Sequence, residues 1–175
     1  MMEMMVVIFL IGILASIMLP RMARRAPQTE WKTILDDLNN LVFFARQEAM
    51  ANQRVYRLAF RSVTTGADSV AVEEERPDPE KPQQKIYTPV SSYYFTPSYT
   101  FHDSIKIKAF YKGRKDVLEE EKGRAYCYVI PDGLVEDVLI QLTHKSENEE
   151  TGGSFKMMPF FGKFEFFVGY EKPER

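Results

Sequence analysis

The residue types that most often carry out enzymatic chemistry are scarce in this sequence. It has two histidines, His102 and His144, and neither stands in the HExxH spacing or a comparable arrangement of metal ligands. It contains no GxSxG, Walker or GxGxxG motif, and its single cysteine, Cys127, excludes an internal disulfide and a cysteine-based metal cluster. The sequence therefore predicts a protein that is not an enzyme and uses no cofactor.

One acidic segment, residues 146–153, has residue types that bind calcium. Glu147, Glu149 and Glu150 offer the hard oxygen ligands that Ca²⁺ prefers. Their spacing lacks the mixed carboxylate and carbonyl pattern of a calcium loop. We therefore expect a solvated loop and no metal there.

The first twenty residues carry the strongest pattern in the chain. Residues 4–19 contain no charged side chain. As a helix, residues 1–19 would measure about 28 Å, close to the roughly 30 Å hydrocarbon thickness of a bilayer. A signal peptide would instead need a charged beginning and a small-residue cleavage site, whereas Pro20 and Arg21 follow here. Residues 1–20 are therefore predicted to be a transmembrane helix.

Three residues of this segment stand out. An ionised Glu3 within the membrane would cost roughly 2–3 kcal/mol or more, so it is either paired and functional or placed at the interface. Pro20 is expected to kink or locally unwind the helix, because it has no N–H and clashes with the preceding turn. Gly12 is expected to permit close helix packing.

Length and charge limit the other possibilities. A chain of 175 residues and 20.4 kDa has room for one domain and a short appendage. The net charge of −2 gives no excess of basic residues for nucleic acid. A local basic cluster is interpreted as a solvated strand edge; its members are Lys106, Lys108, Lys112, Arg114 and Lys115.

Residues 21–54 are predicted to be an amphipathic continuation of the helix. The apolar positions recur at helical spacing and should pack on a sheet; they are Trp31, Ile34, Leu38, Leu41, Val42, Ala45 and Ala49. Arg46, Glu48 and Arg54 flank this stripe. We interpret them as solvated or loosely paired, not as a catalytic site.

Residues 55–175 are predicted to form an antiparallel β domain. The strand-like runs are VYRLAF, DSVAVEE, SIKIKAFY, AYCYVI, DVLIQL, FKMM and KFEFFVGY. Residues 73–85, which are charged and rich in proline, are predicted to be an exposed acidic loop. The resulting fold class is α+β, with a long N-terminal helix packed on an antiparallel sheet or sandwich.

Several of these runs also carry a family resemblance. The acid-to-proline stretch from Glu3 through Ile11-Gly12-Ile13 to Leu19-Pro20 resembles the N-terminal helix of type IV pilins and type II secretion pseudopilins. The runs LNNLVFFARQEAMANQRVYRLAF (38–60), YVIPDGLVEDVLIQL (128–142) and MMPFFGKFEFF (157–167) are similar to the H-type minor pseudopilins, the GspH/FimT class. The motif around Ala45-Arg46 and the Pro131-Asp132-Gly133 turn are the more specific parts of the last three.

The resemblance implies a function in assembly. The chain would be a non-enzymatic minor pseudopilin that joins other pilin-like subunits in a short filament or its tip for type II secretion. Glu3 would meet the N-terminal amine of a neighbouring subunit and set the register. The partners implied are an inner-membrane platform protein, an assembly ATPase and, for the precursor, prepilin peptidase. The resemblance also implies a single-pass protein of the bacterial inner membrane, with its C-terminal domain in the periplasm.

The resemblance and the residues disagree in two respects. The family's leader ends in glycine, followed by a phenylalanine that becomes the methylated N-terminus, and neither precedes Glu3, so we expect the natural chain to begin earlier. Arg21, Arg24 and Arg25 would by themselves place the C-terminal domain in the cytoplasm. We follow the family, whose basic leader would precede Met1.

Two other functions remain open from the sequence. One is a minor type IV pilin that binds DNA or surfaces, which would require a basic face. The other is an unrelated membrane-anchored periplasmic β domain.

Overall fold

Helix α2 (Pro27–Asn52) is the long helix of the computed structural model, which describes Phe9 and residues 27–81, 83–91, 97–145 and 150–173. The chain divides into two compact units, Met1–Thr33 and Ile34–Arg175, and the second contains all the strands found among the described residues. The part of α2 that belongs to the second unit buries the apolar residues predicted to pack on a sheet: Ile34, Leu38, Leu41, Val42, Ala45 and Ala49. The helix ends at Asn52, and Gln53 then adopts a left-handed conformation with φ of 51°.

In the part of the chain that the structure describes, ten strands form two antiparallel sheets. Sheet 1 has the order β3-β2-β1-β7, with β4 also paired to β2; its strands are β1 (Tyr56–Arg61), β2 (Ser69–Pro77), β3 (Lys85–Pro89), β4 (Ser98–Thr100) and β7 (Arg124–Val129). Sheet 2 has the order β10-β9-β8-β5-β6; its strands are β5 (Ile105–Lys112), β6 (Lys115–Asp116), β8 (Leu139–Lys145), β9 (Glu150–Met158) and β10 (Lys163–Val168). A short helix, α3 (Val117–Glu120), follows β6.

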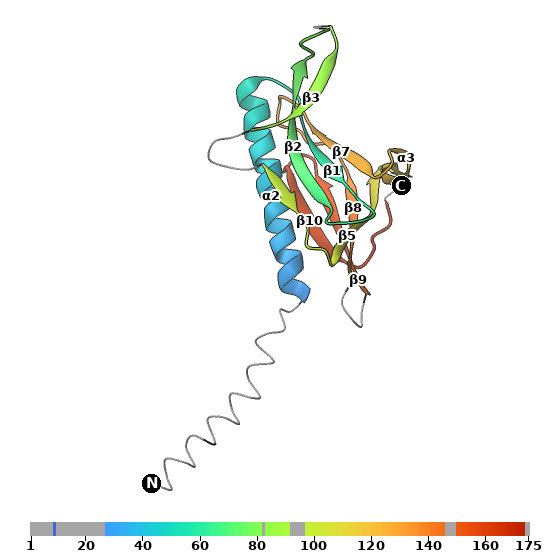
Figure 1. Cartoon of the computed structure of the whole chain (residues 1–175). Coiled ribbons are helices and arrows are strands. Elements are labelled where there is room, and N and C mark those ends of the chain that lie inside the picture. Colours follow the sequence, from blue (N-terminus) through green and yellow to red (C-terminus); the bar gives the residue numbers. More distant parts are fainter. Residues whose placement is uncertain (1–8, 10–26, 82, 92–96, 146–149, 174–175) are drawn as a thin grey trace. The chain divides into compact units, whose positions relative to one another are not determined.

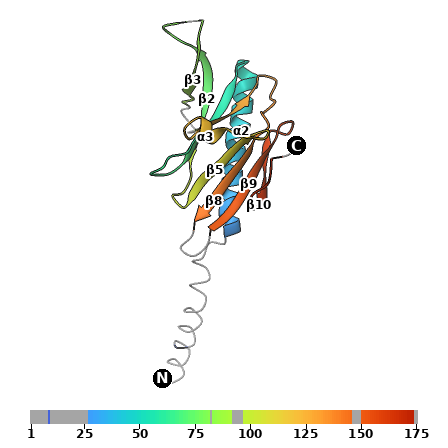
Figure 2. The same cartoon turned by 90° about the vertical axis from the view of Figure 1, so that its right-hand side faces the viewer.

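The core lies where the two sheets meet each other and α2. Phe60 of β1 and Phe110 of β5 are both buried, and their ring centroids lie 5.3 Å apart. Figure 2 shows β5, β8, β9 and β10 side by side, with α2 running along them. The α+β prediction of a helix packed on antiparallel sheets is therefore confirmed. The prediction also gave the helix a transmembrane half, residues 1–20, which lies almost wholly outside the described residues.

A buried carboxylate also joins the sheets. Asp68, with no exposed surface, precedes β2 and accepts hydrogen bonds from the backbone N–H of Ile107 in β5 (2.7 Å) and of Val63 (3.0 Å). Lys106 Nζ lies 3.4 Å from the same carboxylate. A buried charge is tolerated when hydrogen bonds and a counter-charge satisfy it, so Asp68 is a structural residue.

The predicted acidic loop at residues 73–85 is shorter in the structure. β2 continues through Pro77 and pairs with β3 from Lys85, so only residues 78–84 form the connection. Figure 1 shows this β2–β3 hairpin reaching beyond the neighbouring strands. The charged residues suggested a solvated loop, but in the structure their carboxylates are paired: Glu73 with Arg57 at 2.7 Å and Glu75 with Lys85 at 3.0 Å.

Candidate functional site

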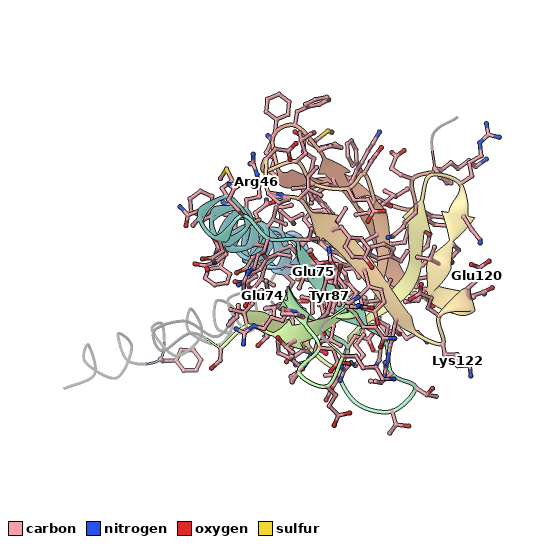
Figure 3. All side chains as sticks on the ribbon, turned by 90° about the horizontal axis from the view of Figure 1, so that it is seen from above. Arg46, Glu74, Glu75, Tyr87, Glu120 and Lys122 are labelled. Atoms are coloured by element: carbon pink, nitrogen blue, oxygen red, sulfur yellow. The ribbon has the colours of Figure 1, made fainter. Side chains whose placement is uncertain are left out.

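Arg46 brings together three segments that lie far apart in the sequence. Its Nε donates a hydrogen bond to the carbonyl of Gly133 at 2.7 Å, 87 positions away. Its Nη1 donates to the carbonyl of Phe161 at 2.8 Å, 115 positions away. Figure 3 shows Arg46 on α2, beside the connection between β9 and β10. Charge-assisted bonds to two separate loops hold those loops against the helix.

The position of Arg46 on the helix follows from the apolar stripe. Ala45 and Ala49 are fully buried, so the residues that follow each of them, Arg46 and Met50, lie one turn apart at the edge of the buried face. From this edge a long side chain can reach the loops that connect strands. Arg46 is therefore half-buried and bonded to two loops rather than loosely paired, which corrects the prediction made from its flanking position.

The first loop held by Arg46 is the turn Pro131-Asp132-Gly133. Gly133 N–H donates to the carbonyl of Ile130 at 2.9 Å, and its φ is +83°, a conformation that favours glycine. A Cβ added at Gly133 would lie 3.1 Å from the sulfur of Met50. The turn thus needs glycine both for its backbone and for its close approach to α2.

The second loop is the tip of the β9–β10 hairpin. Gly162 N–H donates to the carbonyl of Met158 at 2.8 Å, and Gly162 has a φ of +61°. A Cβ at Gly162 would collide with the Arg46 side chain. Pro159, also in this tip, accepts a long 3.5 Å hydrogen bond from the backbone N–H of Val135. Three of the four segments that carry the family resemblance, residues 38–60, 128–142 and 157–167, therefore converge at one junction.

This junction displays an apolar surface, which we call the aromatic end: Met50, Leu134, Phe160 and Phe161. The rings of Phe160 and Phe161 are 81% and 73% exposed, and Met50 and Leu134 are also exposed. Single exposed apolar residues are common, but here four of them lie on segments that Arg46 and the approach of Gly133 to Met50 bring together. Such patches are typical of protein–protein contact surfaces, where buried aromatic residues supply much of the binding energy.

A second set of charges lies where α2 ends. Glu74 of β2 is buried and contacts Arg54 at 2.6 Å and Arg76 at 2.8 Å. Burial alone would raise the pKa of Glu74, but its hydrogen bonds with Arg76 and Arg54 outweigh burial and hold the pKa below its ordinary value of 4.5. Figure 3 shows Glu74 and Glu75 on β2, apart from Arg46. These charges stabilise the helix end and present no converging acid and base.

Burial also shifts the pKa of a neighbouring residue, Tyr56. The hydroxyl of Tyr56 accepts a hydrogen bond from Asn52 Nδ2 at 2.8 Å. Its pKa is raised above 10.0, chiefly by burial and further by the charges of Glu74 and Glu48. Tyr56 thus remains neutral and structural at physiological pH.

The basic cluster predicted from sequence is largely neutralised. Lys112 and Lys115 pair with Glu136 and Glu120, each at 2.8 Å, and Lys106 contacts Asp68. Lys108 Nζ lies 3.7 Å from the centroid of the Tyr170 ring. Four of the five side chains in the cluster therefore have partners inside the domain.

The residues assigned to assembly from sequence, Glu3, Gly12 and Pro20, lie outside the described residues. Within the described part of the chain, no helix is both long and apolar enough to cross a membrane. His102 is exposed and contacts Ser104, at 2.9 Å from Nδ1 to Oγ. Of the glutamates considered for calcium, Glu150 begins β9, whereas Glu147 and Glu149 are not described; the described residues hold no group of three His, Cys, Asp or Glu suited to a metal ion.

Two further groups were missed by sequence reasoning. Asn39 follows Leu38 of the apolar stripe on α2, and its side-chain amide pairs with the backbone of Phe164 in β10. Cys127 is fully buried, and burial raises the pKa of its thiol far above the usual range, so it is unreactive. The glycines in the two turns were the available signals for the Arg46 junction, because each marks a place where backbone and side chain approach closely.

Comparison with known proteins places the fold. No family model and no curated protein sequence matches the chain. Among solved structures, it is similar to the minor pseudopilin EpsH from the type 2 secretion system of Vibrio cholerae, with a TM-score of 0.51 and 10% sequence identity. The match covers 78% of this chain and 95% of that one. The chain therefore has a pseudopilin-like fold, as the sequence motifs predicted.

Proposed function

We propose that this chain is a minor pseudopilin, a non-enzymatic subunit that joins other pilin-like subunits in a short filament, or its tip, for type II protein secretion. One observation carries the proposal: a domain with a pseudopilin-like fold follows an apolar run that has an acid at its start and a proline at its end. Fold alone would not imply a function. The apolar run supplies the second, independent feature that a filament subunit needs.

The proposal assigns a place and a role to the N-terminal residues. Residues 1–20 anchor the chain in the bacterial inner membrane, and the β domain lies in the periplasm. Glu3 pairs with the N-terminal amine of a neighbouring subunit, since two opposite charges in a dry filament core offset their desolvation only when close together. Gly12 lets helices approach and Pro20 bends the segment. A platform protein and an ATPase drive assembly, and prepilin peptidase processes and methylates the precursor.

The aromatic end is proposed to contact a neighbouring pilin-like subunit. Its backbone is held by Arg46, so little conformational entropy is lost when a partner covers it. Two exposed phenylalanines are also costly to leave in water, which favours a permanent partner. The pairing of the basic cluster with carboxylates and with Tyr170 favours a protein partner over DNA.

Site-specific photocrosslinking in the native membrane tests this contact. A photoreactive phenylalanine analogue is placed at Phe160 or, as the control, at Val168, which is 85% exposed at the end of β10. We expect the probe at Phe160 to capture a pilin-like subunit and the probe at Val168 to capture less. Equal yields would remove the aromatic end from the proposal, and the absence of any pilin-like product would contradict assembly.

A further inference from the structure

Sheet 1 places two arginines directly opposite each other. In the β1–β7 register, Arg61 faces Arg124, and opposed residues of an antiparallel pair project from the same face. Both side chains are exposed, and neither forms an ion pair with any residue that the structure describes. Like charges directly opposite destabilise a sheet. Their presence therefore calls for a role other than stability.

The next set of opposed residues on this face, one step along the strands, consists mostly of small side chains. Ala59 of β1 lies between Ala71 of β2 and Tyr126 of β7 in the same register. All three are half-buried, and two carry only a methyl group. An extended segment could therefore approach the sheet closely here, with an aliphatic side chain over the alanines and beside the tyrosine ring.

The third set of residues on this face, centred on Arg57, is held rigidly. The Arg57 guanidinium lies between two aromatic rings, 3.8 Å from the centroids of Tyr87 and Tyr126, and its Nη2 contacts Glu73 at 2.7 Å. Burial lowers the pKa of Arg57, but hydrogen bonds with Glu73 and Tyr128 outweigh it and raise the pKa overall. The cation and both rings are thus fixed before any partner arrives. Tyrosine and arginine held in this way are typical of binding surfaces.

We propose that this Tyr-Arg face, made of Arg57, Ala59, Arg61, Tyr87, Arg124 and Tyr126, binds an acidic, extended segment of a partner protein. Carboxylates of that segment occupy the space between Arg61 and Arg124, and an apolar side chain covers Ala59. Arginine forms bidentate bonds with carboxylates, so two opposed guanidiniums suit one or two acidic side chains. The proposal is independent of filament assembly, since it requires only this face.

Charge complementarity favours a protein segment over nucleic acid. Binding to nucleic acid draws on many phosphate contacts, whereas this face offers two unpaired guanidiniums. Glu73 and Glu75 stand on the same side of β2 and neutralise Arg57 and Lys85, so these two cations add little attraction for a continuous phosphate backbone. Carboxylates spaced along a peptide can meet the arginines and avoid these acids.

The Tyr-Arg face is separate from the aromatic end. Ser62, which follows Arg61, donates its backbone N–H to Gly123, which precedes Arg124, at 2.7 Å. Lys122 therefore marks this end of the face, and Figure 3 shows Lys122 on the side of the domain away from Arg46. Variants at the two surfaces can consequently be tested independently.

Fluorescence anisotropy of the full chain in detergent tests the proposal. The probe is a labelled peptide in which glutamate and valine take turns at every second position with serine between them, so that both project from one side of an extended chain, and its matched control replaces each glutamate with glutamine. We expect the acidic peptide to bind, the control peptide to bind at least about tenfold more weakly, and binding to weaken with salt. No binding of the acidic peptide, or equal binding of both peptides, would overturn the proposal.

Two variants locate the site. Arg61→Ala/Arg124→Ala should weaken peptide binding about tenfold or more. Arg114→Ala/Lys145→Ala, which removes the same charge from exposed positions elsewhere, should leave it unchanged. Equal losses in both would show non-specific attraction and overturn the proposal. Single-stranded DNA that displaces the peptide, and binds more tightly through the same arginines, would overturn it in favour of nucleic acid.

Discussion

The side-chain amide of Asn39 pairs with both backbone groups of Phe164, which lies 125 positions away. Phe164 N–H donates to Asn39 Oδ1 at 2.6 Å, and Asn39 Nδ2 donates to the Phe164 carbonyl at 3.3 Å. Phe164 belongs to β10, the edge strand of sheet 2, whose outer backbone groups would otherwise lack strand partners. The Asn39 side chain thus pairs with β10 as the backbone of a neighbouring strand would, and it joins α2 to the sheet.

Replacing this amide should destabilise the domain. Asn39→Leu leaves the N–H and the carbonyl of Phe164 unpaired, so we expect a loss of about 1–3 kcal/mol in the free energy of unfolding. Chemical denaturation of the full chain in detergent measures the loss. Asn40→Leu, at the next and exposed position, is the control and should change stability little. Equal losses for the two variants would contradict the role given to Asn39.

A double-mutant cycle tests the Arg46 junction. Gly162→Ala should cost about 2 kcal/mol or more, because alanine resists a φ of +61° and its Cβ meets the Arg46 side chain. In an Arg46→Ala background the same change should cost only ~1 kcal/mol, since the collision is gone. Gly113→Ala is the control: its φ is +59°, but nothing lies near its added Cβ. Additive effects of Arg46→Ala and Gly162→Ala would refute the junction.

The charges at the end of α2 predict a pH dependence. The pKa of folded Glu74 lies below 4.5, its ordinary value, so the stability it adds is present above about pH 4.5 and is lost as pH falls through the folded pKa. Glu74→Gln should therefore reduce stability at neutral pH, by ~1 kcal/mol or less because Arg54 and Arg76 are half exposed. The difference between wild type and variant should shrink below pH 4.5. A difference that grows on acidification would contradict this sign.

The opposed arginines predict a stabilising substitution. Arg61→Glu replaces a like-charged pair with an opposite-charged one, so the domain should gain ~0.2–1 kcal/mol and its thermal midpoint should rise by up to about 4 °C. Thermal unfolding at low and high salt measures this gain, which should fall as salt rises. A lower midpoint for Arg61→Glu at low salt would show that the two arginines do not repel each other.

The regular elements could be predicted because their signals are local. The stripe from Ile34 to Ala49 repeats at helical spacing, and the structure has strands at all seven predicted runs. The outer part of the β2–β3 hairpin, residues 73–85, was predicted to be a loop because it carries glutamate, arginine and proline. Those charges are tolerated there only through their pairs with Arg54, Arg57 and Lys85, and these pairs become visible only in the folded chain.

The sites were harder to predict because their partners are distant. Arg46 bonds to carbonyls 87 and 115 positions away, and its own neighbours on the helix indicate only an exposed edge. The turn at Gly133 and the tip at Gly162 could be recognised as turns, but not as neighbours of each other. Similarly, the opposition of Arg61 and Arg124 depends on strand register, which a sequence pattern does not determine across 63 positions.

Co-purification from native membranes tests the assembly role most directly. The protein, expressed from its own gene in its own organism, is isolated as wild type and as Glu3→Ala, and the pilin-like subunits recovered with each are compared. We predict that wild type retains such subunits and that Glu3→Ala retains fewer, because the charge that sets the register is gone. Recovery of no pilin-like subunit with wild type would contradict the assembly role, and equal recovery with both forms would contradict the role of Glu3.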